Sequence, residues 1–380
     1  MKICIISRAL NKKGGISRYN TEIANRLCKC YEVHAITAWY DYLNPRITIH
    51  KYSIPHDPYF LQISSSFIKV SALVRKLNRK FNFDIIHSSE AESLYQDVIT
   101  AHSCIKAAFK KLSINNIFYD FLRRIKPSTL FGLEVEKLIY FKRRYKKIIA
   151  VSSRIKQELI KYYDVPSDDI IVIPNGVNLD EFKPDRLKRQ KIRDKLNIDE
   201  NDIILMFSGH EFKRKGLKYV IKALPKTKKD AKLLVVGKDN PEPYERLALR
   251  LGVLDRIIFT GFVQDISGYY AASDIFVLPS LYEPFGLVIT EAMASGLPVV
   301  VSESVGAAEI LKDGYNGFLI RDPTNPNEIA EILNTLIYDD KIRKQVSRNA
   351  RKIAEKYSWD VVTKRIMEVY EEIWKNKPKF

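Results

Sequence analysis

The residues best suited to chemistry are two glutamates in the second half of the chain, Glu283 and Glu291, with seven residues between them. Glu283 follows a buried-strand pattern at 274–280, and Glu291 lies one to two turns into a helix that leads to another buried run at 298–302. In an open parallel sheet, ligands bind beyond the carboxyl ends of the strands. Carboxylates there accept hydrogen bonds from hydroxyl groups, and the N–H groups of a helix start attract phosphate. The pair therefore favours a ligand that carries both groups.

Each glutamate taken alone also has a structural explanation. Glu283 fits an ordinary acidic loop residue, and Glu291 fits an acid that offsets the positive amino end of its helix. Both explanations stay open for the single residues. The complete string at 281–298, with its Pro-Phe-Gly turn between strand and helix, is harder to explain in this way.

A second candidate is the run of three cations, Lys213, Arg214 and Lys215, which follows the strand pattern at 203–208. Cations at a helix entrance repel one another and oppose the helix dipole unless an anion lies beside them. A diphosphate suits the run, with Arg214 as a bidentate fork and Lys215 as a point charge. The alternative is a solvated basic loop.

The first half offers weaker candidates at the ends of its strands. Gly14 and Gly15 follow the first strand, where glycine allows the backbone to approach a ligand closely, but the pair is not a dinucleotide fingerprint. His102 ends the strand pattern at 96–102. A lone histidine is more often structural than catalytic, so the residue alone does not decide its role.

The elements that position these residues alternate between strand and helix patterns, which indicates parallel, doubly wound sheets. Turn chemistry at 174–180 and the charged run at 183–195 place a domain boundary between 175 and 200. We predict an amino-terminal Rossmann-like domain at 1–180 and a carboxyl-terminal one at 195–357, with a final helix at about 358–375 that packs back on the first domain. Strands and helices are expected at the following positions: strands 2–7, 32–37, 84–87, 96–100, 147–151, 170–174, 203–208, 232–237, 257–260, 274–278, 298–301 and 317–320; helices 16–27, 67–77, 215–226, 241–251, 265–272, 286–295 and 307–312.

Composition agrees with two globular domains. The chain has 380 residues, of which 46% are hydrophobic and 28% are charged. No apolar run approaches the ~18–20 residues that span a bilayer. The four cysteines have neither disulfide nor zinc spacing, which predicts reduced thiols in the cytoplasm. The chain also has no Asp-x-Asp metal motif in a suitable loop.

The net charge of +18 is concentrated in one segment, because residues 104–148 hold twelve Lys or Arg against three acids, a net +9. Cations mixed with aromatics favour an anionic membrane surface. A solvated basic face with its aromatics turned inward is the open alternative. Nucleic acid is not expected, because no RNA-binding signature or zinc module accompanies the charge. The aromatics of the segment are Phe109, Phe118, Tyr119, Phe121, Phe131, Tyr140, Phe141 and Tyr145.

The string at 283–298 resembles the Glu-x7-Glu signature of the retaining GT-B glycosyltransferases of family 4. The resemblance extends to the glycine loop at 14–15, His102, the connector at 173–177 and the Arg-Lys-Gly loop at 214–216. It implies a GT-B fold, two doubly wound Rossmann-like domains facing across a cleft. The first domain looks most similar to lipopolysaccharide core hexosyltransferases. The chain departs from the family at His210, where many members have an arginine, so a phosphate contact from this position is not carried over.

The resemblance implies a donor site on the second domain. Glu283 would bind hydroxyls of the transferred sugar, assisted by the N–H groups of Phe285, Gly286 and Leu287. Glu291 would accept hydrogen bonds from the ribose of the nucleotide.

The remaining roles come from both domains. Arg214 and Lys215 would hold the diphosphate, Val263 would lie beside the base, and Gly15 would contact the donor phosphate. His102 would face the donor sugar as a transition-state contact and not as a covalent nucleophile. The resemblance implies no metal and no cofactor.

These implications predict a retaining, metal-independent hexosyltransferase that uses a nucleotide-diphosphate sugar and a glycan or lipid-linked acceptor. We expect it in the cytoplasm, peripheral to the inner face of the membrane. Two alternatives stay open. A nucleotide-sugar 2-epimerase of related fold would turn over donor without acceptor, and a non-catalytic basic adaptor would bind membrane or nucleic acid without transferring sugar.

Overall fold

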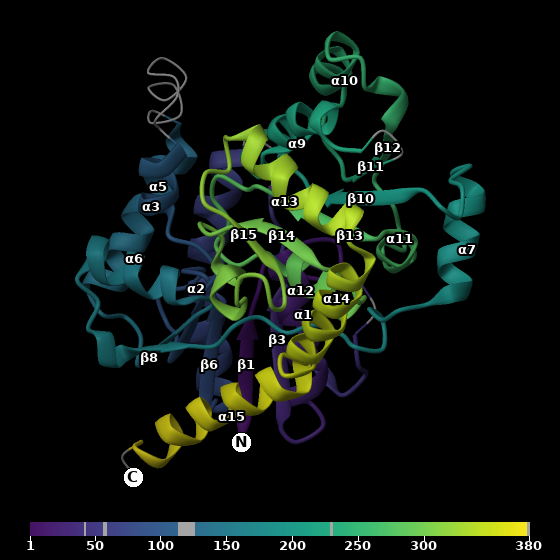
Figure 1. Cartoon of the computed structure of the whole chain (residues 1–380). Helices are drawn as coiled ribbons and strands as arrows, with labels where there is room; N and C mark the ends of the chain where they lie inside the picture. Colours follow the sequence, from purple (N-terminus) through teal and green to yellow (C-terminus); the bar gives the residue numbers. More distant parts are fainter. Residues whose placement is uncertain (42, 56–58, 113–125, 229–230, 378–380) are drawn as a thin grey trace. The chain divides into compact units, whose positions relative to one another are not determined.

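A computed structural model describes residues 1–41, 43–55, 59–112, 126–228 and 231–377. The chain divides into two compact units: the first comprises Met1–Asn175 and Trp359–Phe380, and the second comprises Gly176–Ser358. Each unit has a parallel sheet flanked by helices (Figure 1). The mixed α/β, doubly wound architecture predicted from the sequence is confirmed.

The sheet of the first unit has the order β5-β3-β1-β6-β7-β8-β9 in its described part. All of its pairings are parallel. The order reverses between β1 and β6, so right-handed crossovers place the helices on opposite faces and leave a switch point at the carboxyl ends of these two strands. The strands are β1 (Lys2–Ile6), β3 (Glu32–Thr37), β5 (Ile47–Lys51), β6 (Ile85–Ser89), β7 (Val98–Ala101), β8 (Lys147–Ala150) and β9 (Ile170–Val172), and the short β2 (Ala9–Leu10) pairs separately with β4 (Trp39–Tyr40).

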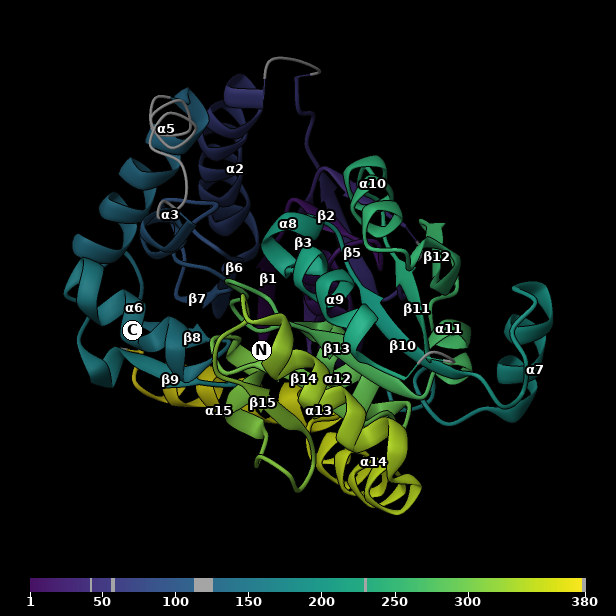
Figure 2. The ribbon, with the colours of Figure 1, turned by 45° about the horizontal axis from the view of Figure 1, so that its top comes forward.

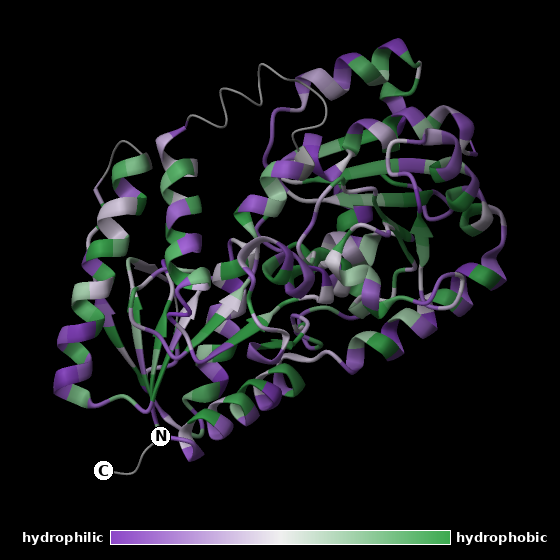
Figure 3. Cartoon of the chain, turned by 90° about the vertical axis from the view of Figure 1, so that its left-hand side faces the viewer, coloured by the Kyte–Doolittle hydropathy of each residue, from purple (hydrophilic) through white to green (hydrophobic). Residues whose placement is uncertain are grey.

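The helices of the first unit bury their apolar faces against this sheet. A core cluster joins Val70, Val74 and Leu77 of the second helix to Ile6 and Ile86 on the strands. Figure 3 shows hydrophobic residues concentrated on the strands, with hydrophilic ones on the outer helical turns. The helices are α1 (Gly15–Leu27), α2 (Tyr59–Phe81), α3 (Ile105–Leu112), α5 (Pro127–Glu136), a π-helix (Lys137–Phe141), α6 (Ser153–Tyr163), a 3-10 helix (Ser167–Asp169) and α15 (Trp359–Lys375).

The final helix α15 completes the first unit although it follows the second in sequence. Trp359 is buried, and its ring meets Tyr19 of α1 edge-on at 5.6 Å. Asp360 accepts a hydrogen bond from Arg26 at 3.0 Å. These contacts explain why the chain returns to the first unit at Trp359.

The sheet of the second unit has the order β12-β11-β10-β13-β14-β15 in its described part, and it reverses between β10 and β13. Figure 2 shows its strands with α9 and α13 packed nearby. The strands are β10 (Ile203–Ser208), β11 (Ala231–Val236), β12 (Ile257–Gly261), β13 (Ile275–Leu278), β14 (Val299–Ser302) and β15 (Phe318–Ile320). The helices are α7 (Arg186–Lys195), α8 (Phe212–Lys215), α9 (Leu217–Ala223), α10 (Glu242–Arg250), α11 (Ser267–Ala272), α12 (Leu287–Ala294), α13 (Pro326–Tyr338) and α14 (Asp340–Glu355), with 3-10 helices at Leu224–Lys226, Leu254–Arg256 and Gly306–Ile310.

Several elements differ from the expectations. The helix expected at 215–226 is broken into α8, α9 and a 3-10 turn, because Gly216 is left-handed (φ 82°) and Pro225 opens the last turn. The segment 307–312 is a 3-10 helix at Gly306–Ile310 and not an α-helix. The second unit begins at Gly176, within the predicted boundary of 175–200, and it includes the segment before 195 because α7 packs on α11.

Candidate active site

The loops after β10 and β13 meet at the switch point of the second unit. These strands are neighbours, with Leu205 beside Ile275. The Leu281 N–H donates to the Arg214 carbonyl at 2.9 Å, and the Ser280 hydroxyl donates to the same oxygen at 3.3 Å. The topology thus brings the cation run and the first glutamate to one place, where open α/β sheets bind ligands.

Gly216 allows this close approach. A Cβ on this residue would lie 2.1 Å from the carbonyl oxygen of Pro279, and its φ of 82° is in the left-handed region. The short α8 therefore ends directly against the β13 loop. At the start of α8, Asp239 accepts the Phe212 N–H at 2.7 Å. Contacts at both ends of α8, at Phe212 and at Gly216, thus fix the backbone that carries Arg214 and Lys215.

Glu283 forms ion pairs with both predicted phosphate ligands. Its Oε2 lies 3.1 Å from Arg214 Nη1 and 3.3 Å from Lys215 Nζ. Only 13% of the Glu283 side chain and 9% of the Lys215 side chain are exposed. Burial alone would raise the pKa of Glu283, but Lys215 and Arg214 outweigh burial and hold this pKa below its ordinary value. The carboxylate is therefore ionised at neutral pH.

The turn after Glu283 directs its side chain. Gly286 adopts φ 97° and caps α12, and a Cβ at this position would lie 3.1 Å from Glu283 Cγ. Phe285 is buried, and its carbonyl accepts the Ala307 N–H at 2.9 Å. Leu287 is the first residue of α12. The three residues predicted to assist at the donor sugar thus follow Glu283 directly, in the turn that opens α12.

Glu291 lies one turn further along α12 and is buried. The Tyr270 hydroxyl, on α11, donates to its Oε2 at 3.1 Å and to the Val288 carbonyl at 3.2 Å. Tyr270 was not predicted from the sequence, because nothing in the local pattern of α11 marks a residue that meets α12. The hydrogen bond from Tyr270 orients the Glu291 carboxylate.

Val263 and His210 are not members of the ion pair at Glu283. Val263 is half-buried in the loop after β12, two strands from β10 in the sheet order. His210 Nδ1 accepts the Lys238 N–H at 3.0 Å, so this nitrogen is occupied in joining the β10 and β11 loops.

Gly15 lies at the switch point of the first unit, as the first residue of α1. A residue that the sequence did not single out connects the surrounding elements. The Asn20 amide donates to Ser7 Oγ after β1 at 3.1 Å and to Ser89 Oγ on β6 at 2.9 Å. The glycine turn is thereby fixed against both central strands.

His102 follows β7 directly and is buried. Its ring meets Tyr19 of α1 edge-on at 4.6 Å, and its Nε2 has no hydrogen-bond partner among the described residues. Burial, with His87 as a smaller cause, lowers the pKa of His102 to about 3. The imidazole is therefore neutral at physiological pH, with one nitrogen available to a ligand.

A buried polar chain supports this histidine, and the sequence did not reveal it. Tyr19 Oη lies 3.1 Å from Thr100 Oγ1, which lies 2.8 Å from His87 Nε2. The other His87 nitrogen pairs with the Tyr370 hydroxyl on α15. Four residues far apart in sequence thus form one network, which only the folded unit brings together.

Glu90, after β6, is the other unpredicted residue beside His102. It adopts φ 60°, which is uncommon for a residue with a side chain. Its Oε1 accepts the Ser103 hydroxyl at 3.2 Å. Burial, aided by Glu136, holds the pKa of Glu90 well above its ordinary value. A strained acid therefore braces the turn that carries His102.

Both halves of the chain match known protein families. Residues 188–353 match the family of glycosyl transferases group 1, and residues 13–181 match Glycosyltransferase Family 4. The chain belongs to the group 1 glycosyltransferases. The family predicted from the Glu-x7-Glu string is confirmed.

Individual proteins with similar sequences are also named as glycosyltransferases. An uncharacterized glycosyltransferase of Methanocaldococcus jannaschii is 37% identical over 59% of this chain and 59% of the relative. The lipopolysaccharide glucosyltransferase WaaG of Escherichia coli is 28% identical over 55% of this chain and 58% of the relative. The matches thus span less than two thirds of the length of these curated relatives.

Solved structures extend the similarity of fold over the whole chain. The crystal structure of WaaG, a glycosyltransferase involved in lipopolysaccharide biosynthesis, covers 97% of this chain and 99% of that one, with a TM-score of 0.81 and 22% identity. Anabaena HepE in complex with UDP and glucose covers 98% and 100%, with a TM-score of 0.75 and 23% identity. At these identities the likeness concerns the fold.

Proposed function

We propose that this group 1 glycosyltransferase moves a hexose from a nucleotide-diphosphate sugar to a glycan or lipid-linked acceptor, with retention of anomeric configuration. The observation that carries the proposal is the ion pair of Glu283, 13% exposed, with Arg214 and Lys215 at a switch point. HepE was solved with UDP and glucose and WaaG is named a glucosyltransferase, which supports a nucleotide donor and a hexose.

In the proposed reaction, positive side chains stabilise the leaving diphosphate, and no covalent intermediate with the protein is formed. Arg214 and Lys215 stabilise the negative charge that develops on the leaving diphosphate, as preorganised cations do in a partly dry site. Glu283 binds hydroxyls of the sugar, and Glu291 binds the ribose. His102, neutral at physiological pH, offers a hydrogen-bonding nitrogen to the sugar and is not a nucleophile.

The donor is tested with a thermal-shift assay against UDP-, GDP- and ADP-sugars. A ligand at about 100 times its dissociation constant adds ~2.7 kcal/mol of stability. Lys215→Ala is expected to abolish the shift, whereas Lys222→Ala on α9 serves as a control and keeps it. A shift that survives Lys215→Ala would place the diphosphate elsewhere. Product anomers read by NMR test retention, and an inverted product refutes that part.

Metal independence is part of the same proposal. Because Arg214 and Lys215 supply two positive charges, we expect transfer to continue after treatment with EDTA. Activity that EDTA abolishes and a divalent cation restores would show that the two side chains are insufficient.

Association with an anionic membrane through 104–148 also stays a prediction. Within this segment Tyr140 and Tyr145 are buried, and Phe131 packs edge-on against Phe60 and Phe67 of α2. These aromatics therefore turn inward, whereas Phe141 is exposed. Phe118, Tyr119 and Phe121 lie outside the described residues. Among the described residues, no helix is both long and apolar enough to cross a bilayer.

A further inference from the structure

We propose that Glu136, at the end of α5, is a positioning residue for His102. Its buried carboxyl group holds the start of α3, and thereby the His102 segment, residues 102–104, which carries the imidazole. This role rests on the proposed function, because His102 is the residue that would contact the sugar. Glu136 acts through His102 and does not itself touch substrate.

The His102 segment lies between β7 and α3 and has no regular structure. Helix α3 begins at Ile105, and the residue before it is Cys104, which is not among the residues that cap helices well. The Ile105 N–H instead donates to Glu136 Oε1 at 2.9 Å, across 31 positions of sequence. The first N–H group of α3 is therefore satisfied by an acid that another helix supplies.

Glu136 is an unusual residue for its position in α5. It is 3% exposed, and it is the buried residue of this ten-residue helix, where an apolar side chain would be expected. Burial raises the pKa of Glu136 to about 7, although the Ile105 N–H and the Tyr163 hydroxyl, which hydrogen-bond to the carboxyl group, lower it. A buried acid is costly unless its hydrogen bonds are made, so these contacts account for its place in the helix.

The neighbouring helices fix the Glu136 carboxyl group at both oxygens. A Cβ at Gly132 would lie 3.0 Å from Ile105 Cδ1, so the glycine lets α5 approach α3 closely. Figures 1 and 2 both show α5 beside α3. The Tyr163 hydroxyl, on α6, donates to Glu136 Oε2 at 2.6 Å. Directly after Glu136 the chain forms the π-helix Lys137–Phe141, a rare geometry that is frequent at functional sites.

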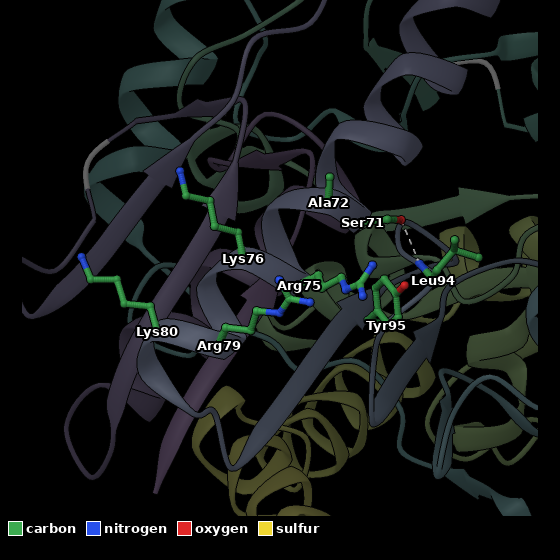
Figure 4. Close-up of a pocket in the computed structure, with 8 residues that line it drawn as sticks. All are labelled: Ser71, Ala72, Arg75, Lys76, Arg79, Lys80, Leu94 and Tyr95. Atoms are coloured by element: carbon green, nitrogen blue, oxygen red, sulfur yellow. Dashed lines mark hydrogen bonds between the residues drawn. The ribbon is translucent and has the colours of Figure 1, made fainter.

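A second acid, Glu90, holds the His102 segment from the loop after β6. The His102 N–H donates to the Glu90 carboxyl group, in addition to the hydroxyl of the next residue. The loop that carries Glu90 is itself fixed to α2, because the Leu94 N–H donates to Ser71 Oγ at 3.0 Å (Figure 4). The His102 segment is thus held by one carboxyl group at its start and by another at the helix that follows it.

This support matters because a hydrogen bond to a sugar depends on where the imidazole lies. A functional group must be held within about 0.5 Å of its productive position, and hydrogen bonds from surrounding residues provide that restraint. Tyr19 contacts the His102 ring edge-on, but neither a strand nor a helix fixes the backbone of the His102 segment. Glu136 and Glu90 supply the missing restraint.

The kinetic test measures release of the nucleoside diphosphate, with water as the acceptor, from the donor that the thermal-shift assay selects. Glu136→Leu fills the same space but removes the acceptor for the Ile105 N–H, whereas Glu136→Gln keeps an oxygen there. We expect Glu136→Leu to lower kcat about tenfold or more with little change in the KM for the donor, because a misplaced His102 weakens mainly the transition state. Glu136→Gln should restore kcat to within about threefold of the parent chain.

Phe131→Ala is the matched control for damage to α5. Phe131 packs edge-on against Phe60 and Phe67 of α2, so its loss weakens the same helix and leaves the carboxyl group in place. All variants are compared below their Tm. Equal losses of kcat in Phe131→Ala and Glu136→Leu would reduce Glu136 to a residue that only stabilises α5, and this would overturn the proposal. A Glu136→Gln variant as slow as Glu136→Leu would overturn it as well.

A second readout follows the imidazole itself and needs no sugar transfer. The chain has six histidines, whose Cε1 positions can be labelled with ¹³C for NMR, and His102→Asn identifies the His102 signal. We expect Glu136→Leu to shift this signal, Glu136→Gln to leave it in place, and the signals of His34 and His50 to stay unchanged in both. An unmoved His102 signal in Glu136→Leu would overturn the positioning role. If the signal moves as expected but no donor is turned over, the proposed function fails and the positioning role stands.

Discussion

The ion pair at Glu283 gives the most direct test of the site. Glu283→Gln keeps the shape of the side chain and removes its charge. Lys215, 9% exposed, has no other acidic partner among the described residues, whereas Arg214 retains Glu211 and the Tyr282 carbonyl. Breaking a buried pair by removing one partner costs about 3–5 kcal/mol. Because Glu283 is 13% exposed, we expect about 2–3 kcal/mol for this variant, below that range.

Glu211→Gln is the matched control. Glu211 also pairs with Arg214, at 2.9 Å, but it is 67% exposed. An exposed pair contributes about 0–1 kcal/mol. Denaturant unfolding monitored by circular dichroism measures both variants. Similar losses, or a loss below about 0.5 kcal/mol for Glu283→Gln, would show that Glu283 is not coupled to a buried Lys215.

The same variant should separate the nucleotide from the sugar. Without the Glu283 charge, Lys215 and Arg214 are better able to bind diphosphate, so we expect UDP to stabilise Glu283→Gln at least as much as the parent chain. A UDP-sugar should lose its additional stabilisation over UDP, since the sugar hydroxyls lose a charged acceptor. Unchanged preference for the UDP-sugar would remove Glu283 from the sugar site.

The pKa of Glu283 adds a pH dependence with a defined sign. Its folded-state pKa lies below the ordinary 4.5, so ionised Glu283 stabilises the fold at pH values above 4.5. This contribution is lost as the pH falls through the folded-state value. The stability of the parent chain should therefore fall toward acid more steeply than that of Glu283→Gln, and parallel curves would contradict the assignment.

Two further predictions concern the other candidate residues. His102→Asn should lower kcat with little change in Tm. Because the pKa of His102 is about 3, this residue should cause no inflection in the pH dependence of the parent kcat between pH 5 and 8. Such an inflection would mean that the imidazole titrates in the working range. Glu291→Gln should weaken the binding free energy of UDP by about 1–3 kcal/mol in titration calorimetry. Glu309→Gln, on the same unit, should leave UDP binding unchanged. Equal affinities for parent and Glu291→Gln would remove Glu291 from the ribose site.

The sequence predicted the strands of the second unit and the loops that carry the candidate site residues, because local pattern determines both. The run 203–208 is β10 as expected, and the Pro-Phe-Gly turn opens α12 within one residue of the prediction. The ion pair between Glu283 and Lys215 follows from topology, because both loops leave carboxyl ends of strands that the switch point makes neighbours.

The polar network and the strained turn near His102, in the first unit, could not be predicted from local pattern. Tyr19, His87, Thr100 and Tyr370 lie on four elements, and each alone looks like an ordinary core residue. Glu90 is recognisable only from its left-handed backbone, which a sequence does not display. The edge strand β5 was missed because only one of its residues, Ile47, is fully buried, which weakens the apolar pattern.

Arg193 of α7 helps to join this helix to the second unit, beside the packing of α7 on α11. Its buried guanidinium donates to the carbonyls of Asp199, Glu200, Asp202 and Ala272 and to the carboxylate of Asp274. A charged run usually indicates a solvated connector, and the sequence analysis therefore left α7 outside the second domain, although the division at 175/176 lies within the predicted boundary of 175–200.

Arg193→Lys tests this contribution, because an ammonium cannot reach all of these acceptors. Each hydrogen bond to a charged group is worth about 1.5–3 kcal/mol, so we expect a loss of about 3 kcal/mol in the free energy of unfolding. Lys191→Arg on the exposed side of α7 is the control and should be neutral. A loss below about 1 kcal/mol for Arg193→Lys would mean that α7 is held by its apolar contacts with α11, and that the buried cation is incidental to where the second unit begins.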